Sequence, residues 1–286
     1  MARSSIHVCV AFVVAFVVAL VVGGAVEAQE VRDYGITRRG RVPDTQVMED
    51  ARAALDRAGV ACSIEAARLR GRDERRVPQF EVTCREGPGY LVVADTDAKA
   101  LSCLVLESQR DRARRDSQST KGPRCELRAN QIVLPLFAAM GAQAGLTCKI
   151  DAGRFVGFAP SQGEIYEIGC ADESGAWIEK IEDGWTTKDC LLVSAQGGQC
   201  IFTDHAEIIT SFAPTLSNSA LASCDLQSVR AMGSDGLDRY YEVLCASRQS
   251  AVVRFDGQGV LAEVIACALA DRIGDGCQFS ARPRMN

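Results

Sequence analysis

Apolar residues recur at helical spacing in the stretch that follows Pro43. Asp44 or Thr45 can cap the first turn of this segment, and Gly59 can end it. The spacing therefore predicts a helix over residues 45–58. Its apolar positions are Val47, Ala51, Ala54, Leu55 and Ala58.

Farther along the chain, apolar and polar residues alternate in short runs that are separated by clusters of Gly, Asp and Ser. Such alternation, with turn residues between the runs, is typical of antiparallel strands. In the middle of the chain the pattern predicts strands at 154–158, 164–169, 176–181 and 200–203. One helical segment followed by about four short antiparallel strands is an α+β arrangement.

The arrangement recurs because the cysteines after residue 60 form three groups of four. The first gap in each group is 22, 22 and 21 residues, and the second gap is 19, 20 and 22. The third gap is 22 residues in the first group and 10 in the other two, because the first group carries a basic insertion at about 108–122. The groups are Cys62, Cys84, Cys103, Cys125; Cys148, Cys170, Cys190, Cys200; and Cys224, Cys245, Cys267, Cys277.

A sequence that repeats at a fixed period predicts tandem copies of one structural unit. Pro135 and Pro214 occupy the helical stretch of the second and third copies, so those helices must be kinked, shortened or restarted. Polar segments at 29–44 and 281–286 are predicted to be disordered tails. We call the three disulfide-stapled copies unit 1 (45–128), unit 2 (129–203) and unit 3 (204–280).

Two further motifs repeat in step with the cysteines. The first is C-x5-R-x2-G after each first cysteine, and the second is aromatic-Glu-aliphatic-x-Cys before each second cysteine. If the first two strands of a unit form a hairpin, the arginine and the glutamate lie opposite each other, which predicts a cross-strand ion pair. The three predicted pairs are Arg68–Glu81, Arg154–Glu167 and Arg230–Glu242.

The cysteines are predicted to form disulfides rather than metal sites. Zinc sites use closely spaced cysteine pairs together with histidines, but no two cysteines here are that close and His205 is the single histidine after the signal segment. Four cysteines allow three connectivities per unit. We favour first with second, which ties the helix exit to the second strand, and third with fourth. We expect no metal and no cofactor.

The N-terminus has the layout of a secretory signal peptide: Arg3, an apolar run over 8–22, and small residues before a cut after Ala28. An uncleaved signal anchor is the alternative, but the run is shorter than the roughly 20 residues that span a membrane. Cys9 leaves with the segment 1–28. No later segment is predicted to span a membrane, so we expect a periplasmic or extracellular protein.

Charge is uneven along the chain. Residues 29–128 contain 20 basic and 17 acidic residues, a net charge of +3, whereas residues 129–286 contain 11 and 19, a net charge of −8. The basic run favours either an anionic partner or a solvated linker, and nucleic acid is not expected in an exported compartment. The candidate contact residues in this run are Arg110, Arg112, Arg114 and Arg115.

Aromatic residues supply a second set of candidates. Trp177 and Trp185 both fall in unit 2, where they either form a contact patch or belong to the core. The layout is similar to the broad plan of the β-lactamase-inhibitory proteins, but no motif of that family is matched. A shared layout does not imply a shared function.

No nucleophile, redox or phosphate-loop motif occurs in the sequence. His205 is the single histidine after the signal segment, and a helix start explains it. The sequence therefore predicts a non-enzymatic binding or scaffold protein of the bacterial envelope, with a protein or envelope polymer as partner. The alternatives are an inhibitor or modulator of an exported enzyme, and a hydrolase that uses paired carboxylates, for which Glu167, Asp172 and Glu173 are available.

Overall fold

The computed structural model describes residues 44–279. The predicted signal peptide at 1–28 and the predicted C-terminal tail at 281–286 lie outside these residues. So does the predicted tail at 29–44, except for Asp44, which is the first residue of a helix. Among the described residues, no helix is long and apolar enough to cross a membrane.

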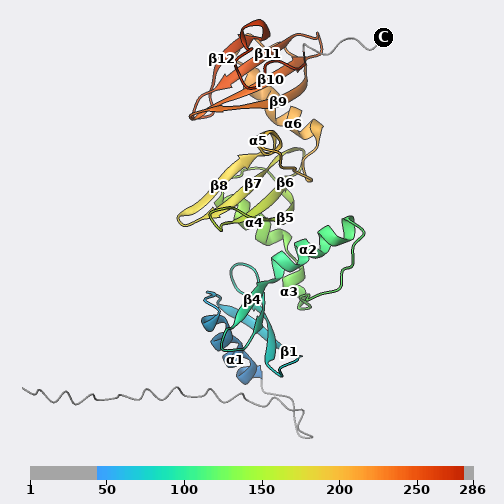
Figure 1. Ribbon diagram of the computed structural model, residues 1–286, viewed down its shortest axis with the longest axis vertical. Coiled ribbons are helices and arrows are strands. Elements are labelled where there is room, and N and C mark those ends of the chain that lie inside the picture. Colours follow the sequence, from blue (N-terminus) through green and yellow to red (C-terminus); the bar gives the residue numbers. More distant parts are fainter. Residues whose placement is uncertain (1–43, 280–286) are drawn as a thin grey trace, which may run out of the picture. The chain divides into compact units, whose positions relative to one another are not determined.

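Within residues 44–279, twelve strands form three four-stranded antiparallel sheets, and in each sheet the strands follow one another in chain order (Figure 1). Sheet A consists of β1 (Ile64–Arg72), β2 (Pro78–Cys84), β3 (Tyr90–Val93) and β4 (Lys99–Ser102). Sheet B consists of β5 (Ile150–Phe158), β6 (Glu164–Cys170), β7 (Glu173–Ile181) and β8 (Gly184–Asp189). Sheet C consists of β9 (Leu226–Asp235), β10 (Asp238–Cys245), β11 (Ser250–Phe255) and β12 (Leu261–Ala266). The α+β class predicted from the sequence is confirmed at this level.

A helix precedes each sheet and packs against its first strand. Pro135 stands in the first turn of the helix before sheet B, and Pro214 is the second residue of the 3-10 turn that follows the helix before sheet C. A proline is tolerated there because the first turn of a helix leaves its N–H groups unpaired. These helices are α1 (Asp44–Arg57), α4 (Leu134–Gln143) with the short α3 (Arg128–Gln131) before it, and α6 (His205–Phe212) with η1 (Ala213–Leu216) after it.

Helical turns that the sequence analysis did not predict begin at the third cysteine of each unit. They also correct the interpretation of the basic insertion at 108–122, because the first of them continues to Arg115 and carries the basic run on a helix. The three are α2 (Cys103–Arg115), α5 (Cys190–Ala195) and η2 (Cys267–Leu269).

The strand predicted at 200–203 is wrong. The fourth strand of sheet B is β8, which comes earlier, and residues 200–203 have no strand conformation. The backbone N–H groups of Ile201 and Phe202 donate to the carboxylate of Glu167 instead of to a neighbouring strand.

The repeated glycine of the C-x5-R-x2-G motif lies at a β-bulge. In sheets A and B the pairing register shifts between Leu69 and Gly71 and between Phe155 and Gly157, and sheet C has a shift at the same place. Gly71 has φ +138°, a conformation that favours glycine. The bulge therefore explains why this position repeats.

Six disulfides join the first cysteine to the second and the third to the fourth of each unit, which is the connectivity favoured from the sequence. The first bond of a unit ties the exit of the leading helix to the end of the second strand. The second bond ties the turn after the fourth strand to the segment that leaves the unit. Disulfides at this density are typical of oxidising, exported compartments.

The repeated glutamates are fully buried and act as acceptors for the backbone that follows the last cysteine of each unit. The carboxylate of Glu167 accepts the N–H groups of Ile201 and Phe202, at 2.5 and 2.7 Å, and pairs with Arg154 at 2.6 Å. A buried carboxylate is stable only when it is paired and hydrogen-bonded in this way.

Units 1 and 3 repeat this arrangement. Glu242 accepts the N–H groups of Gln278 and Phe279 and pairs with Arg230 at 2.6 Å. Glu81 accepts the N–H groups of the two residues after Cys125 and an amide hydrogen of a buried asparagine. The glutamate thus holds the exit of each unit against its sheet.

One of the three predicted ion pairs is wrong. Arg68 lies opposite Glu81 in the sheet, as expected, but Arg70 makes the 2.6 Å contact with that carboxylate. The guanidinium of Arg68 lies 3.7 Å from the half-buried Glu126. Position 70 is the bulge residue, and alternation along the strand puts its side chain on the same face as position 68. Units 2 and 3 have apolar Val156 and Met232 there, so the arginine of the motif keeps the carboxylate.

We predict that the stability of unit 1 falls in acid. Burial tends to raise the pKa of Glu81, but its hydrogen bonds from the backbone, Asn130 and Arg70 outweigh burial and hold the pKa below its ordinary value of 4.5. A carboxyl group whose pKa is lower in the folded state than in the unfolded chain stabilises the fold at every pH above its pKa in the unfolded chain. That contribution is lost as the pH falls through the folded value. Urea denaturation of the chain should therefore give lower unfolding free energies from pH 5 downward.

The variant Glu81→Gln is the control for this pH dependence. It keeps the size of the side chain but cannot titrate, so its unfolding free energy should depend less on pH over the same range. Equal slopes in the two proteins would show that Glu81 contributes nothing to acid unfolding.

A candidate binding cleft beside sheet C

A cleft of about 230 Å³ opens where unit 2 meets unit 3. From unit 2, β7, β8 and α5 contribute Ser174, Asp189 and Leu191. From unit 3, α6 and η1 contribute Ile208, Ser211, Phe212 and Thr215. Sheet C contributes Arg239, Tyr241 and Phe255, and the turn between β11 and β12 contributes Gly259.

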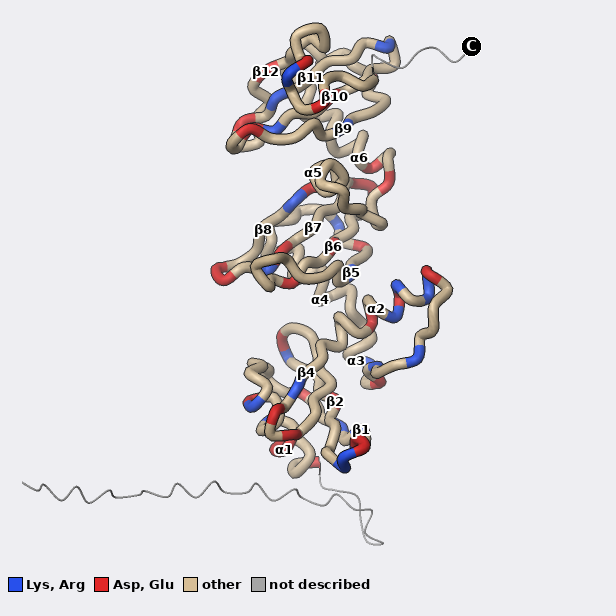
Figure 2. Tube along the Cα trace, viewed as in Figure 1, with Lys and Arg blue, Asp and Glu red and all other residues tan. Residues whose placement is uncertain are grey.

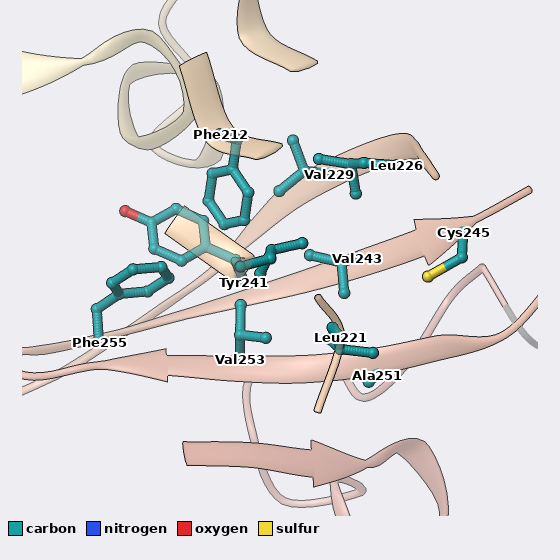
Figure 3. Packing of buried hydrophobic residues seen from close by; sticks show 11 residues of the cluster. Phe212, Leu221, Leu226, Val229, Tyr241, Val243, Cys245, Ala251, Val253 and Phe255 are labelled. Atoms are coloured by element: carbon teal, nitrogen blue, oxygen red, sulfur yellow. The ribbon is translucent and has the colours of Figure 1, made fainter. Parts of the chain in front are cut away.

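Three aromatic rings form the apolar wall of the cleft. Each pair among Phe212, Tyr241 and Phe255 has ring centroids 5.2–5.7 Å apart, and all three pairs meet edge to face. This is a favoured geometry for aromatic pairs. Figure 3 shows the Tyr241 ring between the other two, with its hydroxyl group directed away from Val243 and Val253. The three rings form a rigid wall, because all three side chains belong to the buried core of sheet C.

Charged groups lie close to Tyr241. The guanidinium of Arg239 and the carboxylate of Asp189 lie 3.8 Å apart, and both side chains are more than a third exposed. Burial raises the pKa of Tyr241 to about 12, the negative charge of Asp189 adds to the rise, and Arg239 opposes it. Tyr241 is therefore a neutral hydrogen-bonding group at neutral pH.

Several polar groups that line the cleft already form hydrogen bonds within the chain. The hydroxyl of Ser211 accepts the backbone N–H of Ser174 at 2.7 Å, and the hydroxyl of Thr215 donates to the carbonyl of Phe212. The carboxylate of Asp189 accepts the N–H of Leu192 and caps α5. A nucleophilic hydroxyl needs a base within hydrogen-bond reach, and these bonds supply none.

The volume limits what the cleft can hold. Sites that enclose a whole small molecule measure roughly 300–1,000 Å³, so a cleft of about 230 Å³ fits a smaller group. An aromatic or branched side chain of a larger partner is a group of suitable size. An apolar pocket with a polar rim is also the usual setting for the anchor residue of an interface.

The two tryptophans do not form a shared patch. In β7, Trp177 pairs with Lys188 while Lys180 pairs with Trp185, so alternation puts the two indoles on opposite faces of sheet B. Trp185 packs against Tyr166 with ring centroids 6.2 Å apart, and its indole N–H donates to Gln143. Trp185 therefore packs over the core of sheet B.

Trp177 lies under the segment that follows α5. A Cβ at Gly198 would come within 3.0 Å of its ring, so the backbone approaches closely here. The Nε1 atom of Trp177 is buried and has no hydrogen-bond partner among the described residues. The ring supports the exit segment of unit 2.

The four candidate arginines lie on α2, away from the cleft. Arg110 donates to the carbonyl of Thr120, and Arg114 contacts Glu107 at 2.8 Å and also pairs with Asp111. Arg112 and Arg115 are exposed. The ion pairs of Arg110 and Arg114 favour a solvated helix over an anion-binding surface.

Two groups of potential metal ligands occur among the described residues. Each combines a buried glutamate with two cysteines, as in Glu81 with Cys103 and Cys125. These cysteines are joined to each other, so their sulfur atoms are not thiolate ligands. The carboxylate is already bonded to backbone N–H groups. We therefore interpret the groups as structural.

The aromatic-Glu-aliphatic-x-Cys motif marks Tyr241 as a repeated aromatic position, but nothing in the motif indicates a cleft. Phe212, Arg239 and Phe255 carried no motif at all. The aromatic residues of unit 3 are the sequence signal that could have indicated the cleft. Their position beside Asp189, however, depends on the contact between units 2 and 3. Comparisons with family models, curated proteins and solved structures found no match to this chain.

Proposed function

We propose that this protein is an exported, non-enzymatic binding protein of the bacterial envelope, and that the cleft beside sheet C receives an apolar side chain of a protein partner. The observation that supports the proposal most is the pocket walled by Phe212, Tyr241 and Phe255, with Arg239 and Asp189 at its rim. The six disulfides, together with the predicted signal peptide, support an exported location, in the periplasm or outside the cell. Two of the three stapled units, units 2 and 3, surround the cleft.

The chemistry of the cleft favours binding over catalysis. One acidic side chain, Asp189, lines it among the described residues, whereas glycoside hydrolysis needs two carboxyl groups flanking the bond. Glu167, the buried candidate for that role, is held by Arg154 and two backbone N–H groups. An inhibitor is expected to present an aromatic residue on a projecting loop; Trp185 is the candidate for that role, but its ring packs against Tyr166.

A protein partner suits the cleft better than an envelope polymer does. Aromatic walls bind apolar side chains by removing them from water, at about 25 cal/mol per Å² of buried apolar surface. The rim charges then select the orientation of the partner, because a mismatched charge beside Arg239 or Asp189 is costly.

Filling the mouth of the cleft tests the proposal. Thr215 is exposed and lines the cleft, so Thr215→Trp should block it without disturbing the core. We expect crosslinked partner recovered from the envelope fraction to fall by about tenfold or more relative to the unmodified chain.

Ser217→Trp provides the matched control. Ser217 is exposed just beyond η1 but does not line the cleft, so this variant should recover the partner as well as the unmodified chain. Recovery that is equal for all three proteins would show that the partner binds elsewhere, and no recovery from any of them would contradict the binding function.

A further inference from the structure

Units 1 and 2 each contact the next sheet through the same kind of element. α2 begins at the third cysteine of unit 1 and packs against β5, and α5 begins at the third cysteine of unit 2 and packs against β9. These two strands are the first strands of sheets B and C and lie at their edges. The same contact therefore joins consecutive units twice.

Apolar side chains directly after the cysteine make these contacts. Leu104 is buried in the core of sheet B, beside Phe137 and Tyr166. Leu191 and Leu192 pack against the core of sheet C. Sheets B and C thus complete their cores with leucine side chains supplied by the preceding unit.

The helix also shields the edge of the sheet. The hydroxyl of Ser108, on α2, accepts the backbone N–H of Phe155 at 2.9 Å. An edge strand presents unpaired N–H and C=O groups, which favour pairing with another chain unless they are covered. The preceding unit supplies this cover for sheet B.

Unit 3 also has a helical turn that begins at its third cysteine, but within residues 44–279 no further sheet follows that this turn could cover. Its third cysteine, Cys267, begins η2, and Leu269 stands two residues after the cysteine, as Leu192 does in unit 2. Leu269 is 79 % exposed, whereas the neighbouring Ala270 is fully buried. The leucine that would contact a following sheet is therefore open to solvent.

Unit 1 has the equivalent edge strand, β1, but among the described elements no helix of a preceding unit covers it. Leu69 of β1 lies opposite Phe80, as Phe155 of β5 lies opposite Tyr166. β1 packs against α1 and β2, and no helix of the described chain covers it as α2 covers β5.

The charges of the two ends are complementary. Unit 1 contains 16 basic and 14 acidic residues, a net charge of +2, whereas unit 3 contains five and ten, a net charge of −5 (Figure 2). Opposite charge steers two surfaces together and suppresses pairing between like ends. The charges thus favour contact between unit 3 of one molecule and unit 1 of another.

We infer that the surface around Leu269 of one copy docks on the β1 edge of a second copy. The two surfaces differ, so the contact is heterologous and each bound copy leaves one free end of each kind. The association is therefore open-ended and head to tail. It does not involve the cleft beside sheet C, so it stands or falls separately from the proposed binding function.

Sedimentation equilibrium of the exported chain tests this inference. We expect the average mass to rise steadily with concentration without settling at a dimer, and to fall when salt is added. Leu269→Asp should weaken the association by about tenfold or more. Leu237→Asp is the matched control, because Leu237 is also 79 % exposed but lies in the turn between β9 and β10. It should associate like the unmodified chain.

A mixing experiment separates this contact from other kinds of association. Leu269→Asp keeps an intact β1 edge, so it should bind the free Leu269 end of unmodified chains and lower their average mass by terminating growth. A chain that stays monomeric at all concentrations, a mass that settles at a dimer, or a Leu269→Asp variant that associates like the unmodified chain would each overturn the inference.

Discussion

Replacing Glu167 with alanine is expected to lower the unfolding free energy of unit 2 by about 3–5 kcal/mol, which is the cost of leaving one partner of a buried ion pair uncompensated. The substitution removes the partner of Arg154 and the acceptor of the N–H groups of Ile201 and Phe202. These groups stay close to the sheet, because the disulfide of Cys200 holds the exit segment in place.

Urea denaturation followed by tryptophan fluorescence measures this loss directly. Both tryptophans lie in unit 2, and Trp177 stands opposite Glu167 in the sheet. Glu173→Ala is a suitable control, because Glu173 is an exposed acid of the same sheet and surface substitutions usually change stability by less than about 0.5 kcal/mol. A loss below about 1 kcal/mol for Glu167→Ala would contradict the role assigned to the buried glutamate.

Removing the disulfide between Cys190 and Cys200, by replacing both with alanine, is expected to cost about 3 kcal/mol. The bond closes a loop of 10 residues, and its loss lets the unfolded chain explore more conformations. The same bond positions the two N–H groups that Glu167 accepts, because Ile201 directly follows Cys200. The disulfide and the glutamate therefore stabilise one structure, the exit of unit 2.

A double-mutant cycle tests that dependence. Combining Glu167→Ala with the loss of the disulfide should cost less than the sum of the separate effects, with an interaction energy of about 0.5–3 kcal/mol. The fluorescence-monitored urea experiment applies to all four proteins. Strict additivity would mean that the exit segment keeps its place without the bond, and that the two features stabilise the unit independently.

The register of each first hairpin could be predicted because it depends on local spacing. Arg154 and Glu167 are separated by a single turn, and hairpin pairing brings them opposite each other. The partner of the glutamate in unit 1 could not be predicted in the same way. There the bulge residue is itself an arginine, Arg70, and two cations on one face compete for the same carboxylate.

The role of the glutamates as acceptors for backbone N–H groups could not be predicted from the sequence either. The repeat of aromatic-Glu-aliphatic-x-Cys marked Glu81 and its equivalents, but the backbone N–H groups they accept lie 34 to 46 residues farther along the chain. Backbone groups leave no pattern of residue types, so residues 200–203 were interpreted as a strand. The N–H groups of Ile201 and Phe202 donate to the carboxylate of Glu167 instead.

The sequence by itself determined the α+β class, the three groups of cysteines, and the pairing register at the repeated arginines and glutamates, and it favoured one of three possible connectivities, which the structure shows. These features follow from short-range spacing, which is set by the periods of helices and strands and by the reach of a disulfide. Only the tertiary structure decided which helix of one unit covers the next sheet, where the cleft lies, and why Leu269 is exposed. Those features depend on contacts between residues of different units, and such contacts leave no fixed spacing in the chain.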